Sequence, residues 1–266
     1  MFYALLFLFT SLAAGLLPVL LGGLAWWAGV LIALLTFALC FVLYVLVFSS
    51  PTWHTDMEKP IEKQAAFTKI GARGAGQMLC FFAGARPHIT GLEKLPKDSC
   101  FLFISNHRSM FDPMLVIGDL ADYNISFISK PSNLKIPLVG RAAYALGFLP
   151  IDRENDRAAL KTILTAADYM KRGVCSMGVY PEGTRSRTGE LLPFHAGCFK
   201  AAQRAGVPVA VACVRGTEKL KKRPLIGTDV YLDILELIPA EQVKAMKTTE
   251  LSEYCRNRIA GKISDS

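Results

Sequence analysis

The first 50 residues of the chain form an uninterrupted apolar block. From Met1 to Ser50 there is no Asp, Glu, Lys, Arg or His. A single helix of this length would extend roughly 70 Å, whereas the hydrocarbon core of a bilayer is about 30 Å thick. Gly22 and Gly23, preceded by Pro18, mark a break. The pattern therefore predicts an N-terminal transmembrane hairpin over residues 1–50, with helices at residues 2–21 and 24–48.

Basic residues follow the apolar block. A cleaved signal peptide is disfavoured, because no positive charge precedes the apolar run and the run is too long. Two crossings would return the chain to the side on which it began, and an excess of Lys and Arg after the second helix is typical of the cytoplasmic side of a cell membrane. These cations are Lys59, Lys63, Lys69, Arg73 and Arg86. Because the connection between the helices is short and uncharged, a re-entrant hairpin that does not cross fully stays an alternative.

Residues 51–87 are predicted to link the hairpin to a folded domain. Within them, residues 61–85 mix Ala, Phe, Met and Leu with Lys and Arg. This pattern favours a helix, with two interpretations left open: an amphipathic helix in the membrane interface, or a core helix packed on the domain.

From residue 88 to residue 266 the pattern is that of an α/β domain. Short apolar runs rich in β-branched and aromatic residues predict strands, and between them lie amphipathic stretches that predict helices. We therefore expect a largely parallel or mixed sheet flanked by helices, with sites at the carboxyl ends of its strands. The predicted strands are 100–105, 125–130, 147–151, 174–180, 207–214 and 229–237, and the predicted helices are 154–173, 196–206 and 248–259.

Charge and cysteine usage narrow the class of protein. The net charge of +8 comes entirely from the chain after residue 50, and it favours contact with anionic lipid head groups or phosphorylated substrates. No nucleic-acid motif accompanies this charge, so we expect no nucleic-acid partner. The seven cysteines form no C-x-x-C pair, which fits a reducing compartment and indicates neither a disulfide framework nor a metal site.

Candidate chemistry first appears in the stretch FISNHRSMFDP, Phe103 to Pro113. His107 directly follows a predicted strand, and in an extended chain its side chain would lie roughly 17 Å from that of Asp112. The two meet only if the chain turns, which a helix with Asp112 as N-cap and Pro113 as first residue would allow. Asp112 could then bind one imidazole nitrogen and leave the other basic; otherwise the pair is an N-cap and a solvated histidine.

Two further strand ends carry arginine. GFLPIDR ends at Arg153, and YPEGTRSRTGE places Arg185 and Arg187 in a Gly-containing turn after a strand. The carboxyl ends of parallel strands can converge, so these guanidinium groups could gather around His107. Guanidinium groups bind phosphate well, and backbone N–H groups of the turn would add donors.

In order and spacing these stretches resemble the four sequence blocks of the glycerolipid acyltransferase superfamily, over about residues 89–217. The N-H-x-S-x-x-D block is met by Asn106, His107, Ser109 and Asp112, and the arginine-closed block by Phe148, Ile151 and Arg153. The F-P-E-G-T-R-S block runs from Tyr180 to Ser186, with Tyr180 in place of the usual Phe. The fourth block is the weakest match: Val207 and Pro208 fit, but Val211 stands where a second proline is common.

The resemblance implies a reaction and a role for each site residue. It implies transfer of a fatty acyl group from acyl-CoA or acyl carrier protein, as co-substrate, to the sn-2 hydroxyl of a 1-acyl-glycerol 3-phosphate held in the membrane. It implies that His107 is the general base and Asp112 its partner, with no cofactor and no metal. The acceptor's phosphate and glycerol would be bound by Arg153, Glu182, Gly183, Thr184, Arg185 and Lys130.

Other interpretations stay open at this point. Relatives that share these blocks could acylate glycerol 3-phosphate or a lyso-aminolipid. The chain could also be a catalytically silent lipid-binding module of the membrane, although His107 and Asp112 are both present. A serine hydrolase is disfavoured because the sequence lacks G-x-S-x-G.

Overall fold

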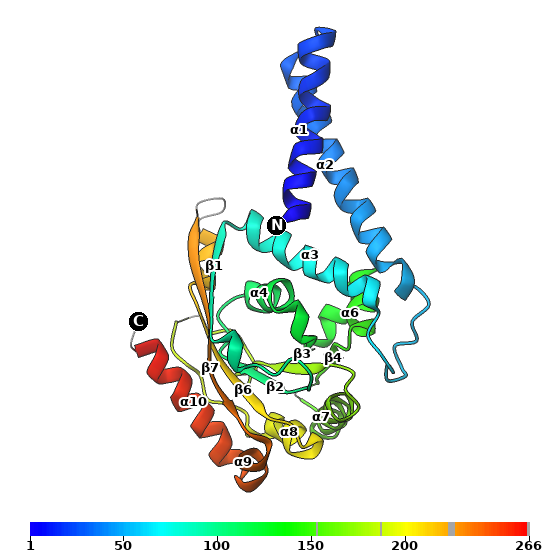
Figure 1. Ribbon diagram of the computed structural model, residues 1–266. Helices are drawn as coiled ribbons and strands as arrows, with labels where there is room; N and C mark the ends of the chain where they lie inside the picture. The colour runs from blue at the N-terminus through cyan, green and yellow to red at the C-terminus, as the bar shows by residue number, and fades with distance from the viewer. Residues whose placement is uncertain (153, 187, 223–226, 265–266) are drawn as a thin grey trace.

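In the computed structural model the apolar block forms two helices that project from the rest of the molecule (Figure 1). The structure describes residues 1–152, 154–186, 188–222 and 227–264. Helix α1 (Phe2–Gly22) and helix α2 (Trp26–Ser49) pack on each other as a hairpin. Both are long and apolar enough to cross a membrane by length and composition. The predicted hairpin is confirmed, with its break within two residues of the expected position, whereas a full crossing stays a prediction.

Helix α3 (Ala66–Phe82) lies between the hairpin and the remainder of the chain (Figure 1). On one side the Tyr44 hydroxyl of α2 donates a hydrogen bond to the carbonyl of Gly71. On the other side α3 crosses helix α4 (Phe111–Asp119) closely: a Cβ atom on Gly76 would lie 2.6 Å from the carbonyl oxygen of Met114. Phe67 and Ile70 stay exposed. Helix α3 thus packs on the domain, as one of the two interpretations expects, and its contact with the membrane interface stays a prediction.

A seven-stranded sheet organises the chain from residue 85 onward, in the order β1-β7-β6-β2-β5-β3-β4. Neighbouring strands are parallel except β6 and β7, which are antiparallel. The expected mixed α/β sheet is therefore confirmed. The strands are β1 (Ala85–Thr90), β2 (Leu102–Ser105), β3 (Ile125–Ser129), β4 (Leu149–Pro150), β5 (Ser176–Val179), β6 (Val209–Arg215) and β7 (Thr228–Ile238).

Each predicted strand corresponds to an observed one, and β1 is the strand that the sequence pattern did not predict. It lies at the edge of the sheet, contains Pro87, and most of its residues are exposed. Edge strands tolerate proline and need no apolar face. The signal on which strand prediction depends is therefore absent from this segment.

Helices cover both faces of the sheet. One face packs against α7 (Asp156–Lys171), α8 (Lys200–Ala205), α9 (Ala240–Ala245) and α10 (Thr248–Ser264), and the other against α3 and α4. Two short helices, α5 (Pro131–Leu134) and α6 (Val139–Ala145), follow β3. The 3-10 turns are Ser50–Thr52, Leu92–Lys94, Ala121–Tyr123, Ala196–Phe199 and Thr217–Lys222. The carboxyl ends of β2, β3, β5 and β6 share one edge, because these strands are mutually parallel.

Candidate active site

His107 and Asp112 meet at that edge. The Nδ1 atom of His107 lies 2.8 Å from Oδ2 of Asp112. The carboxylate is fully buried, whereas the imidazole side chain retains 19% of its exposure. A turn between the end of β2 and the start of α4 brings the two residues together, as their functional interpretation requires.

Asp112 accepts hydrogen bonds on both of its carboxylate oxygens. Its Oδ2 atom accepts the backbone N–H groups of Arg108 (2.6 Å) and Ser109 (2.8 Å) in addition to the imidazole. Its Oδ1 atom accepts the hydroxyl of Thr217 at 2.5 Å. An ionised carboxylate only accepts, so in the ionised form the hydrogen shared with His107 lies on Nδ1. The Nε2 atom of the neutral ring is then left with its lone pair.

The predicted helix start needs correction. Asp112 is not an N-cap, because α4 begins at Phe111 and Asp112 lies in its first turn. Its carboxylate accepts amides of the preceding loop, Arg108 and Ser109, and so folds that loop back toward the imidazole. Asp112 can orient His107 because its carboxylate accepts hydrogen bonds from the loop amides and does not cap the helix.

Glu182, in the segment that follows β5, binds the backbone of His107. Its Oε1 atom accepts the backbone N–H of His107 at 2.6 Å, and its Oε2 atom accepts that of Leu192 at 3.0 Å. The N–H of Ser186 donates to the carbonyl of His107 at 3.0 Å. Burial raises the pKa of Glu182 above its ordinary value, and the two amide donors oppose that shift. The 182–186 segment therefore holds both backbone groups of His107.

The other predicted acceptor-binding residues are more open. Thr184 and Arg185 are exposed, and Gly183 adopts a left-handed backbone with φ of 72°, which favours glycine at this turn. Lys130 is exposed at the end of β3 and precedes α5. Arg153, like Arg187, lies outside the described residues.

Tyr180 packs its ring against the imidazole. The ring centroids of His107 and Tyr180 are 4.2 Å apart and nearly parallel, and Tyr180 stacks in turn on Phe127. Within the described part of the chain the Tyr180 hydroxyl is buried without a hydrogen-bond partner. Burial also raises the pKa of Tyr180 well above its ordinary value. The ring fixes the plane of the imidazole, and the hydroxyl adds no contact.

The sequence assigned no role to two residues that shape the site, Thr217 and the block residue Asn106. Thr217 is fully buried, and its hydroxyl donates the hydrogen bond to Oδ1 of Asp112. The Asn106 side chain exchanges two hydrogen bonds with the backbone of Val214, at 2.9 and 2.8 Å, and so joins β2 to β6 beyond their ladder. Thr217 stands two residues after β6, so its position as a polar residue at a strand end was a usable signal. The partner of Asn106 had no sequence signal.

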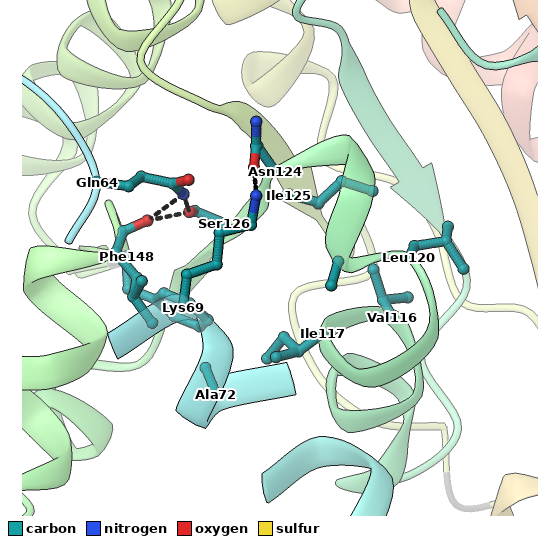
Figure 2. Close-up of a pocket in the computed structure, with 12 residues that line it drawn as sticks. Gln64, Lys69, Ala72, Val116, Ile117, Leu120, Asn124, Ile125, Ser126 and Phe148 are labelled. Carbon is teal, nitrogen blue, oxygen red and sulfur yellow. Dashed lines mark hydrogen bonds between the residues drawn. The ribbon is translucent and has the colours of Figure 1, made fainter. Parts of the chain in front are cut away.

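A small cavity lies away from this site. It is enclosed by α3, α4 and β3, and Figure 2 shows Gln64, Lys69 and Ser126 among its lining residues. Its volume of about 30 Å³ gives room for one or two water molecules. None of the predicted site residues lines it, so it is not part of the site at His107.

In the described ranges no group of three His, Cys, Asp or Glu side chains could hold a metal ion. The expectation that the protein uses no metal and no cofactor stays a prediction.

A buried carboxylate that orients an imidazole, next to an arginine-bearing turn on an α/β sheet, is a site suited to acyl transfer to a hydroxyl. Residues 86–215 match the family model described as Acyltransferase. The chain belongs to this acyltransferase family.

Several relatives share a more particular description. The chain is 34% identical to the 1-acyl-sn-glycerol-3-phosphate acyltransferase of Escherichia coli (strain K12), over 62% of this chain and 67% of that protein. It is 29% identical to the protein of the same name from Haemophilus influenzae, over 74% and 81%. The crystal structure of the 1-acyl-sn-glycerophosphate acyltransferase PlsC from Thermotoga maritima superposes with a TM-score of 0.65 at 27% identity, covering 85% of this chain and 88% of that one.

Proposed function

We propose that this protein transfers a fatty acyl group from an acyl thioester to the sn-2 hydroxyl of 1-acyl-sn-glycerol 3-phosphate, which forms phosphatidic acid for phospholipid biosynthesis. The names of its relatives in Escherichia coli and Haemophilus influenzae support this acceptor. The observation that carries the chemistry is the 2.8 Å contact between His107 and the buried Asp112.

His107 acts as general base in this proposal. Its Nε2 atom takes the proton from the acceptor hydroxyl as that oxygen attacks the thioester carbonyl. The tetrahedral intermediate then collapses, the carbon–sulfur bond breaks, and the thiolate receives the proton from His107. Asp112 keeps the hydrogen on Nδ1 and stabilises the imidazolium between these steps.

The exposed turn after β5 binds the phosphorylated acceptor. Arg185 offers a guanidinium fork to phosphate, and Thr184 in the same turn adds its backbone N–H, whereas the N–H of Gly183 donates to the carbonyl of Tyr180 at 3.0 Å. Lys130 and Arg153 contribute further positive charge. Glu182 acts through the backbone of His107, because both of its oxygens already accept amides.

Membrane attachment places the domain where its substrate resides. The acceptor and the diacyl product both reside in the bilayer, and the apolar hairpin keeps the domain at the bilayer surface. The cations after the hairpin favour the cytoplasmic face of the cell membrane. Acyl-CoA or acyl carrier protein would reach the site from that side.

The test is a reconstitution assay. The full chain in phospholipid vesicles is supplied with lysophosphatidate and a labelled acyl group, carried either on CoA or on acyl carrier protein. Glycerol 3-phosphate and a lyso-aminolipid serve as competing acceptors in parallel. Labelled phosphatidic acid is the expected product. Acylation of a competing acceptor instead, or no product from any pair as in a silent lipid-binding module, would refute the proposal.

A further inference from the structure

The C-terminal helix contacts the site through Arg256. The Nη2 atom of its guanidinium donates to the carbonyl of Leu191 at 3.0 Å, and its Nε donates to the carbonyl of Leu192 at 3.3 Å. Arg256 is half-buried on α10, beyond the residues that match the family and beyond all four sequence blocks.

One peptide unit links this guanidinium to Glu182. The carbonyl of Leu191 and the N–H of Leu192 belong to the same amide group. Arg256 binds the oxygen of that amide, and Glu182 binds its N–H at 3.0 Å. The other oxygen of Glu182 binds the N–H of His107 at 2.6 Å. The contacts therefore run without a gap from α10 to the backbone of His107.

The charges of Arg256 and Glu182 strengthen the hydrogen bonds that each makes with the Leu191–Leu192 amide. A cation on an amide oxygen polarises the amide and makes its N–H a better donor. Glu182 is 4% exposed, and a buried carboxylate is costly unless strong donors bind it. The polarised Leu191–Leu192 amide is such a donor, so loss of the guanidinium would weaken the grip of Glu182 on its loop.

We infer that Arg256 is a positioning residue for the acyl transfer: through the Leu191–Leu192 amide and Glu182 it fixes the backbone of His107. The inference rests on the proposed function, since it concerns the same reaction. It concerns the placement of the base and not the binding of the acceptor.

The experiment compares Arg256→Ala and Arg256→Lys with the unchanged chain in the vesicle assay with lysophosphatidate. We expect kcat of Arg256→Ala to fall about tenfold, less than the roughly 100-fold that a 1 Å misplacement can cause. The KM for lysophosphatidate should stay within about twofold. Arg256→Lys keeps the charge with one donor group and should recover part of the loss.

Arg258→Ala is the matched control. Arg258 lies on the same helix, its side chain is 51% exposed, and its guanidinium pairs with Glu236 at 2.9 Å. We expect its kcat to equal that of the unchanged chain. If Arg256→Ala fails to fold in a thermal melt, Arg256→Lys decides alone: a lowered kcat at constant KM supports the inference, and an unchanged kcat overturns it.

A double substitution tests the path itself. Glutamine at position 182 has one acceptor oxygen for two N–H donors, so Glu182→Gln already removes one of the two hydrogen bonds that link Leu192 to His107. Adding Arg256→Ala in that background should lower kcat less than twofold further. A full tenfold loss in both backgrounds would overturn the route through Glu182. No acylation by the unchanged chain would instead refute the proposed function, and the two failures are thus distinct.

Discussion

The two sides of the candidate site differ in how their side chains are held. On the side of β2 and α4, Asp112 is fully buried and accepts four hydrogen bonds, and the imidazole of His107 is stacked on Tyr180. On the side of the turn after β5, Thr184 and Arg185 are exposed. The chain itself supplies the contacts of the proposed base, whereas the side proposed to bind the acceptor is open to solvent. Substitutions on the first side should therefore change turnover, and those on the second should change affinity.

His107→Ala is expected to have the largest effect. Because a positioned general base contributes about 10² to 10⁴ in rate, kcat should fall by at least about 100-fold. The fold should persist, since the imidazole side chain is partly exposed. The measurements are vesicle turnover and a thermal melt. Near-normal turnover of a folded His107→Ala protein would remove the base assignment.

Arg185→Ala is expected to act mainly on the acceptor. A charge-assisted hydrogen bond contributes about 1.5 to 3 kcal/mol. The apparent KM for lysophosphatidate should accordingly rise about 10- to 100-fold, with a much smaller change in the KM for the thioester. Saturation curves for both substrates provide the measurement. Equal rises in the two constants would show that the contrast between the two sides is mistaken.

Thr217→Val would sharpen the comparison within the buried side. Valine has a similar shape, so the change removes the hydroxyl and leaves one oxygen of Asp112 without its donor. We expect a loss of about 1.5 to 3 kcal/mol in the free energy of unfolding. We also expect kcat to fall about tenfold at unchanged KM, because the orientation of Asp112 loosens. Thr217→Ser, which retains the hydroxyl, should stay close to the unchanged chain.

Tyr180→Phe should have the smallest effect. The hydroxyl it removes is buried and lacks a partner in the described part of the chain. Removing such a group should stabilise the fold by about 1 kcal/mol and leave kcat within about twofold, because the ring stack on His107 is kept. Chemical denaturation measures the first quantity and the vesicle assay the second. A large loss of activity would mean that the hydroxyl has a function beyond the stack.

Much of the fold was predictable because its signals are local. The uncharged block, the buried strands and the amphipathic helices of residues 154–173 and 248–259 each follow from residues near one another in the sequence. Edge strand β1 was not predictable, since a half-exposed strand containing Pro87 lacks the apolar alternation that identifies a strand.

The sequence by itself determined the apolar hairpin, the α/β class, and the His107–Asp112 and Arg185 stretches, because residue type and short spacing carry these features. Only the tertiary structure decided what holds them. Thr217 lies 105 positions from Asp112, and Glu182 lies 75 positions from His107. Arg256 reaches Leu191 across 65 positions. Such contacts depend on how strands and helices pack, and no local pattern records which distant donor a buried carboxylate will bind.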